Sequence, residues 1–266
     1  MIKLGKLQPR MDKRTIRLRT ILKALAPPAS YNVYQALGLS PKLQMWGNDA
    51  VGDCVMVAQA NFETVLQYLQ QQKIIPITTG VVENQYYREQ GATRCHPHPD
   101  NGMVELDVLN WWRNKGWKVG ANTYKIYAHA AFNWQDDTEF MSAIYYLYGA
   151  MIGIALPLTA QVQWNNQQPW DVVEGPGSDP GSWGLHGVYV PAGDPDYYYC
   201  DTWGKIQKMT RAFVRKYVDE AHAVVPQPDA WVTPSPVDLN TLDNILDEIE
   251  ASSLAVQETR YCVTRR

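Results

Sequence analysis

The order of helical and strand-like patterns constrains the fold of this chain more than any other sequence feature. Apolar residues recur at helical spacing over 53–72, 105–115 and 136–148. After residue 149 the pattern changes to short apolar runs separated by Pro, Gly and Asp, which is typical of strands. Helices followed by strands predict an α+β fold with a helical lobe and a β-rich lobe. A functional site is then expected between the lobes.

Composition divides the 266 residues into four parts. Residues 1–24 form a basic arm, in which Asp12 is the single acid. A core is expected over 25–225, and the proline-rich stretch 226–236 predicts a linker. Residues 237–266 predict an acidic amphipathic helix and a tail, and this helix either docks back on the core or binds a partner.

The basic arm bears on the choice of partners. The net charge of the whole chain is −3, so the residues after the arm are acidic. We interpret the arm as a segment that packs on its own acidic body. In a second interpretation the arm and the C-terminal helix bind protein partners, whereas nucleic acid is not expected as the main partner.

No segment predicts export or membrane insertion. The basic start is not followed by the apolar region of a signal peptide, and the apolar stretch near 150–158 is too short to span a bilayer. The cysteines contain no CxxC pair, which favours free thiols and cytoplasmic synthesis. They are Cys54, Cys95, Cys200 and Cys262.

The stretch GNDAVGDC, residues 47–54, places a cysteine where the first helix is expected to begin. Unpaired amides at a helix start favour negative charge, so they lower the pKa of a thiol there and make Cys54 a candidate nucleophile. The alternative is a buried structural cysteine. Asp53 is either a carboxylate that raises the pKa of this thiol or an N-cap of the helix.

A nucleophilic cysteine needs a base, and His186 lies at the entry to a predicted strand, in GLHGVYV. Asp201, in CDTWG, follows another apolar run, and an acid there would orient the imidazole. The stretch 95–98, Cys-His-Pro-His, is interpreted as an exposed loop rather than a metal site. No phosphate-binding glycine motif occurs, so no cofactor is expected.

These segments together resemble the papain-like cysteine peptidases. GNDAVGDCVMVAQA is similar to the segment in which that family's cysteine begins a long helix, GLHGVYV to its His-Ala-Val strand, and CDTWG to its Asn-Ser-Trp-Gly strand end. Cys54 precedes His186 by about 130 residues and Asp201 by about 150, as in this family. The resemblance is collinear over roughly 25–225.

The resemblance implies a two-lobed papain-like fold and a thiol hydrolase that cleaves peptide or protein substrates through an acyl-enzyme. Cys54 would be the nucleophile and His186 the base and then the acid. Asp201 would take the orienting place where the family usually has Asn. Asn48 would supply an oxyanion-hole amide, although it is shorter than the family's Gln. Trp203 would shield the contact between Asp201 and His186.

The same groups would serve a thiol amidase or an acyl transferase. A different class of function is a papain-like fold that serves as a structural or binding component of an assembly, for example a phage virion. The residues ahead of the core are fewer than in the inhibitory propeptides of secreted family members, so an ordinary zymogen is not expected.

Overall fold

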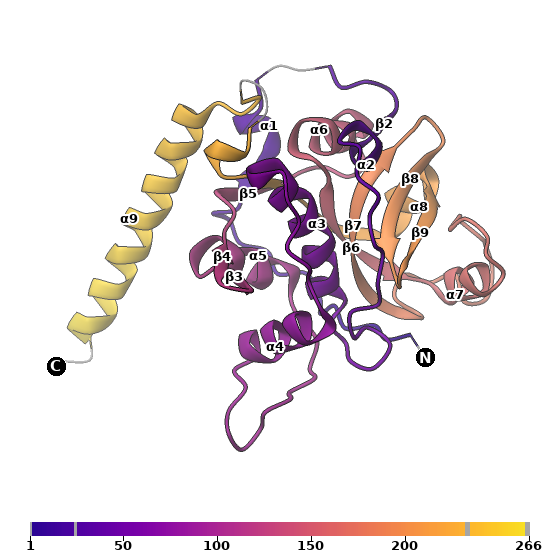
Figure 1. Ribbon diagram of the computed structural model, residues 1–266, viewed down its shortest axis with the longest axis horizontal. Coiled ribbons are helices and arrows are strands. Elements are labelled where there is room, and N and C mark those ends of the chain that lie inside the picture. The colour runs from indigo at the N-terminus through magenta and orange to yellow at the C-terminus, as the bar shows by residue number, and fades with distance from the viewer. Residues whose placement is uncertain (1, 24–25, 232–234, 264–266) are drawn as a thin grey trace.

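A long twisted sheet forms the centre of the computed structural model, which describes residues 2–23, 26–231 and 235–263 (Figure 1). Its strand order is β1-β5-β10-β6-β7-β8-β9, and β2 pairs with β7. The pairings are antiparallel except that of β1 with β5. The strands are β1 (Ile16–Arg17), β2 (Tyr31–Asn32), β5 (Ala128–Ala131), β6 (Ala150–Leu156), β7 (Gly184–Gly193), β8 (Tyr197–Thr202), β9 (Lys205–Thr210) and β10 (Val218–Val225).

The helices confirm the predicted order of elements. The three helices expected from periodicity are present as α3, α5 and α6, and most of the sheet follows them in the chain. A separate hairpin joins β3 (Trp117–Val119) to β4 (Asn122–Tyr124). The helices are α1 (Leu18–Ile21), α2 (Val33–Ala36), α3 (Cys54–Gln71), α4 (Thr79–Glu89), α5 (Glu105–Asn114), α6 (Asp137–Leu147), α7 (Leu158–Asn165), α8 (Arg211–Tyr217) and α9 (Leu239–Val263), with a 3₁₀ turn η1 (Pro228–Ala230).

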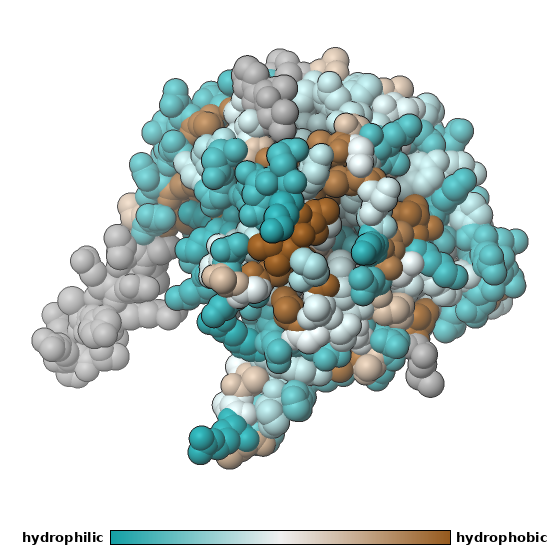
Figure 2. Space-filling view, in the orientation of Figure 1, coloured by the Kyte–Doolittle hydropathy of each residue, from teal (hydrophilic) through white to brown (hydrophobic). Residues whose placement is uncertain are grey.

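Helix α3 is the central helix (Figure 1), and it packs on β7 and β8 of the sheet and also contacts α4 and α5. Apolar side chains such as Val57, Phe62 and Leu66 are buried along it. Figure 2 shows apolar groups gathered over the middle of the face on which α3 lies. Because both sides of α3 are packed, the position of its first residue is fixed within the core.

The described residues of the basic arm pair with acids of the core. Arg10 bonds to Asp107, Arg19 bonds to Glu139, and β1 adds to the sheet through Ile16, which lies opposite Ala130. This geometry agrees with a segment that packs on its own acidic body. Surface ion pairs of this kind each contribute only about 0–1 kcal/mol, so the strand pairing and the buried residues hold the arm.

Helix α9 begins against the core and runs outward from it (Figure 1). Leu242 is fully buried, and the Asp243 carboxylate accepts a hydrogen bond from Tyr127. The first half of this helix therefore docks back on the core. The side chains after residue 252, including that of Cys262, lie outside the described residues, as do residues 264–266.

None of the helices in the described ranges combines the length and the apolar character needed to cross a membrane.

Candidate active site

Cys54 begins α3 and lies against the strand that carries the predicted base. Its side chain is 1% exposed, and the Gly187 amide of β7 donates a hydrogen bond to its Sγ at 3.4 Å. An added Cβ on Gly187 would come within 2.9 Å of Val55, so glycine permits this close approach of strand and helix. The structure thus brings the start of α3 and the His186–Gly187 segment together, as the sequence predicted.

His186 is held by two residues at the end of β8, Thr202 and Trp203. Its Nε2 lies 2.7 Å from the Thr202 hydroxyl oxygen. The Trp203 ring stacks on the imidazole, with centroids 4.3 Å apart and planes at 18°. Trp203 has a φ of 45°, an uncommon conformation for a bulky residue, which turns its ring over the histidine. Trp203 therefore covers the His186 ring, but the contact between Asp201 and His186 that it was predicted to shield is absent.

The structure corrects the prediction that Asp201 orients His186. The Asp201 carboxylate accepts a hydrogen bond from the Tyr34 hydroxyl instead, and Thr202 bonds to the imidazole. Successive side chains of a strand point to opposite faces of the sheet, so Asp201 and Thr202 cannot both face His186. Burial raises the pKa of Asp201 to about 8, which favours a neutral carboxyl on that face.

Asn48 is buried, but its amide does not point at the thiol as predicted. Its Nδ2 donates to the Val51 carbonyl at 3.2 Å, which closes the loop before α3. The shorter side chain is thus used as a turn residue. The first backbone amides of α3, which have no partner within the helix, are then the donors at this position.

Asp53 does not cap α3. It occupies the N-cap position, yet its side chain makes no capping hydrogen bond, and it is fully buried. Burial raises the pKa of Asp53 to about 8, so the group is largely protonated at neutral pH. The negative charge of Asp53 that the sequence predicted beside the thiol is therefore mostly absent.

The segment Ile2–Leu7 of the arm lies across this site. Its Gly5 carbonyl accepts a hydrogen bond from the Met103 amide at 2.8 Å, and the Leu7 amide donates to the Met103 carbonyl at 2.8 Å. On the other side, the Lys6 amide donates to the carbonyl of Leu185, the residue before His186, at 3.3 Å. The segment thus bridges the helical side and the strand side of the site.

Backbone packs against backbone at the middle of this segment. A Cβ built on Gly5 would lie 1.7 Å from the Gly52 carbonyl oxygen, and one on Gly102 would lie 2.3 Å from the Gly5 carbonyl oxygen. Real atoms cannot approach so closely, so these glycines are required for the segment to enter. This occupant was not predicted from the sequence, although Gly5 within the basic arm was a signal for it.

Comparison with solved structures decides the fold. Xylellain, a cysteine protease from Xylella fastidiosa, is 14% identical, with a TM-score of 0.63 over 85% of this chain and 97% of its own. The procathepsin L2 proteinase from Tenebrio molitor is 11% identical, with a TM-score of 0.59 over 84% of this chain and 78% of its own. The chain has the papain-like fold.

A third papain-like structure, the Carica candamarcensis cysteine protease CMS1MS2, is 13% identical, with a TM-score of 0.55 over 75% of this chain and 99% of its own. No protein-family model and no curated protein matches the chain. The similarity to these solved structures confirms the predicted α+β class.

Desolvation controls the charge state of the candidate site. Burial raises the pKa of Cys54 to about 11, against smaller lowering by the Gly187 and Gly5 amides. Burial also lowers the pKa of His186 to about 3. The expectation of a low thiol pKa is therefore wrong for this closed state. At neutral pH it holds a neutral thiol and a neutral imidazole, and among the described residues no hydrogen bond joins the two.

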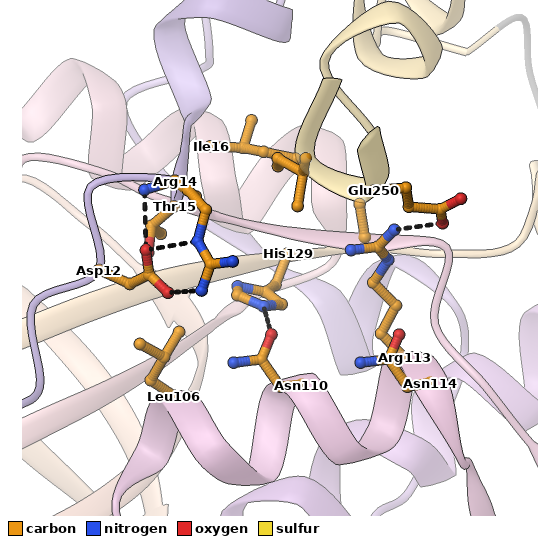
Figure 3. Close-up of a pocket in the computed structure, with 12 residues that line it drawn as sticks. Asp12, Arg14, Thr15, Ile16, Leu106, Asn110, Arg113, Asn114, His129 and Glu250 are labelled. Atoms are coloured by element: carbon orange, nitrogen blue, oxygen red, sulfur yellow. Dashed lines mark hydrogen bonds and ion pairs between the residues drawn. The ribbon is translucent and has the colours of Figure 1, made fainter. Parts of the chain in front are cut away.

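The cavity drawn in Figure 3 lies elsewhere, between the arm, α5, β5 and α9, and has a volume of about 490 Å³. Charges of both signs line it. Asp12 pairs with Arg14, Glu250 pairs with Arg113, and His129 bonds to an amide (Figure 3). The balance of charge gives this cavity no preference for an anion or a cation.

The Cys-His-Pro-His stretch, 95–98, lies in an exposed loop after α4. Within the described ranges, no three His, Cys, Asp or Glu side chains are grouped so that they could hold a metal ion.

Buried carboxyls give a prediction for stability against pH. Burial raises the pKa of Asp53, Glu63 and Asp201 to about 8. Their stabilising effect is complete below the unfolded pKa, near 4, and is lost as pH rises through about 8. Buried histidines with lowered pKa act below about pH 6.5 and in the opposite sense. We therefore expect the melting temperature to fall between pH 6.5 and 8.5.

Thermal denaturation at fixed ionic strength measures this. Each proton by which the folded and unfolded states differ changes the free energy of unfolding by about 1.4 kcal/mol per pH unit. Asp201→Asn keeps an acceptor for Tyr34 but cannot titrate, so its curve should be flatter. A melting temperature that is constant or rises over this window would contradict the assignment.

Proposed function

We propose that the protein is a thiol-dependent hydrolase that cleaves peptide bonds through an acyl-enzyme on Cys54, and that residues 2–7 close its site in the described state. The observation that carries this proposal is the position of the thiol. It lies at the start of α3 and against the strand segment that carries His186, whose ring is held by Thr202 and Trp203. Among the described residues no hydrogen bond joins the Cys54 thiol to the His186 ring, so the proposal has these two side chains meet when residues 2–7 leave the site.

The tautomer of His186 supports its role as base. If Nε2 carries the proton and donates it to the Thr202 hydroxyl oxygen, Nδ1 holds a lone pair. Nδ1 is buried and has no hydrogen-bond partner among the described residues. A lone pair without a competing donor is available to accept the thiol proton.

The reaction then follows from these groups. His186 accepts the Cys54 proton, and the thiolate attacks the peptide carbonyl to form a tetrahedral oxyanion. Backbone amides at the start of α3 stabilise this charge, a contribution of about 3 kcal/mol per donor in other enzymes. The imidazolium gives its proton to the leaving amine, and the C–N bond breaks. Water, deprotonated by His186, hydrolyses the thioester and restores the thiol.

A dipeptide vinyl sulfone tests the proposal, because its addition to a thiol depends on the neighbouring imidazole. The full-length Gly5→Ala variant, expected to open the site, should be labelled at Cys54 as mapped by mass spectrometry. Labelling should be lost in Gly5→Ala/His186→Ala and retained in Gly5→Ala/Cys95→Ser. Iodoacetamide, which needs only an accessible thiolate, reports the opening itself. Fast reaction with iodoacetamide but none with the vinyl sulfone would refute the proposal.

A second candidate function is a papain-like binding component without catalysis. The buried Cys54, with its pKa raised to about 11, favours it, because such a thiol is inert in the described state. The two candidates differ in the opened state. A binding component would keep a slow Cys54 in Gly5→Ala even when the thiol is accessible. Amidase or acyl-transferase activity would instead retain vinyl sulfone labelling, and the acceptor of the second step would distinguish it from a peptidase.

A further inference from the structure

Lys6 is a buried cation on the segment that closes the site. Its side chain is fully buried, and Nζ lies 3.0 Å from an Asp219 carboxylate oxygen and 2.8 Å from one of Glu220. It also donates to the Leu7 carbonyl at 3.1 Å. A lysine is rarely buried to this extent unless acids surround it, so the surroundings of Lys6 form a specific receptor for a positive charge.

The chain builds this receptor, which we call the acidic socket (Glu105, Asp219 and Glu220), with two local devices. The pairing of β10 with β6 shifts register between Val218 and Glu220, and this irregularity brings successive acids within reach of one ammonium group. In β6, Gly153 makes room for the lysine stem, since a Cβ there would lie 2.0 Å from the Lys6 Cε.

Glu105 is the third acid of the socket, since its charge helps to raise the pKa of Lys6. It is fully buried at the start of α5 and lies 3.0 Å from the His222 ring nitrogen Nδ1. Burial lowers the pKa of His222 to about 4, so this histidine is neutral at pH 7 and brings no positive charge. Burial alone would lower the pKa of Lys6, but Glu220 and Asp219 outweigh it and the pKa is raised. Lys6 therefore supplies the cation in the socket.

Removal of Lys6 would leave the Asp219 and Glu220 carboxyls, whose side chains are 21% and 8% exposed, without their cation. Removing one partner from a buried ion pair is strongly unfavourable, because the remaining charge has lost its solvation and gains nothing in return. Burial already raises the pKa of Glu105 to about 8 and that of Glu220 to about 7, so a neutral side chain in the socket would favour their protonated forms. A lysine or arginine side chain from another peptide would pair with them as carboxylates, so the emptied socket discriminates by charge.

The acidic socket lies close to the reactive atoms. The residue next to Lys6 is Gly5, whose backbone amide lies against the Cys54 thiol and stabilises the thiolate. The Lys6 amide donates to Leu185, adjacent to His186. A peptide bound where residues 2–7 now lie would therefore place one side chain in the socket and its backbone at the thiol.

We propose that the acidic socket is a specificity pocket that selects peptides with a lysine or arginine side chain near the bond attacked by Cys54, and that Lys6 occupies it as an internal substitute. The cleavage part of this proposal rests on the proposed hydrolase function. The selective binding of a basic side chain does not, because it depends on the socket acids alone.

Binding to the full-length chain tests the socket without catalysis. In Lys6→Ala, n-butylammonium should raise the melting temperature in a saturable way, whereas n-butanol of similar shape should not. The matched control is Lys13→Ala, which removes an exposed lysine of the same arm and leaves the socket filled, so it should respond to neither. Equal shifts with the two compounds, or equal shifts in the two variants, would overturn the proposal.

Should Lys6→Ala fail to fold, Gly5→Ala/Cys54→Ser opens the site and cannot cleave. Fluorescent peptides that differ only in a central Lys, Arg or Leu should bind it with at least about tenfold preference for the basic residues, a modest ratio for a buried charge pair. Adding Glu220→Gln should remove most of the preference. Equal binding of the Leu peptide would overturn the socket.

The two proposals fail differently. Charge-selective binding with an inert Cys54 would refute the hydrolase and leave the socket. Cleavage of Lys and Leu peptides at equal rates by Gly5→Ala would refute the socket and leave the hydrolase.

Discussion

Replacing Gly5 with alanine is expected to accelerate alkylation of Cys54 at pH 7 by about a hundredfold or more. The added Cβ would meet the Gly52 carbonyl oxygen at 1.7 Å. Neither segment can move aside as a flexible side chain could, because both are backbone at that point. Residues 2–7 must then leave, and water reaches the thiol. The pKa of Cys54, raised to about 11 by burial, should return toward the ordinary thiol value near 8.5, which alone increases the thiolate fraction at pH 7 about 300-fold.

Iodoacetamide labelling followed by mass spectrometry at Cys54 measures this rate. The exposed Cys95 in the same chain serves as an internal reference for ordinary thiol reactivity. The matched control is Gly80→Ala, because a Cβ at Gly80 meets no atom within 4 Å. A rate in Gly5→Ala equal to that of Gly80→Ala would show that residues 2–7 do not control access.

Replacing Thr202 with valine is expected to reduce vinyl sulfone labelling in the Gly5→Ala background by about tenfold to a hundredfold, whereas Asp201→Asn should stay within a few-fold. Valine has the shape of threonine but cannot accept the Nε2 proton at 2.7 Å, so the imidazole loses its preferred tautomer. A positioned base contributes about a hundredfold or more to such reactions, and part of that contribution depends on orientation.

Thr202→Ser restores the hydroxyl and should restore the rate, which separates a positioning role from a loss of packing. The pH dependence of labelling should shift in Thr202→Val and return in Thr202→Ser. The opposite ranking, with Asp201→Asn slow and Thr202→Val unchanged, would revive the assignment made from the sequence alone.

The fold and the places of Cys54 and His186 within it could be predicted from the sequence because their signals are local. A helix that starts at Cys54 and strands with His186 and Trp203 at their ends follow from periodicity and from a few motifs. Which of Asp201 and Thr202 contacts His186 does not follow from a local signal. These neighbours point to opposite faces of β8, and only the pairing with β7 decides which face meets His186.

The hydrogen-bond partner of Asn48 and the charge state of Cys54 could not be predicted from the sequence for a second reason. Both depend on contacts between segments that are distant along the chain. The Asn48 amide is used within its own loop, and the pKa of Cys54 depends on burial, to which a segment some fifty residues upstream contributes. The groups that lower the pKa of Cys54 most are the Gly187 and Gly5 amides, which lie far from the start of α3 in the chain, and desolvation outweighs them.

The strand pairing of β1 affects how a free peptide competes with the arm for the site. Because Ile16 is fixed in the sheet opposite Ala130, residues 2–7 are tethered by a short connection, and their free reach is roughly 30 Å. An occupant held on such a tether acts at an effective concentration in the millimolar range. A free peptide must exceed that concentration, scaled by its relative affinity, to displace it. A single cut between residues 8 and 15 would dilute the occupant into solution and make the site open at protein concentrations below its intrinsic Kd.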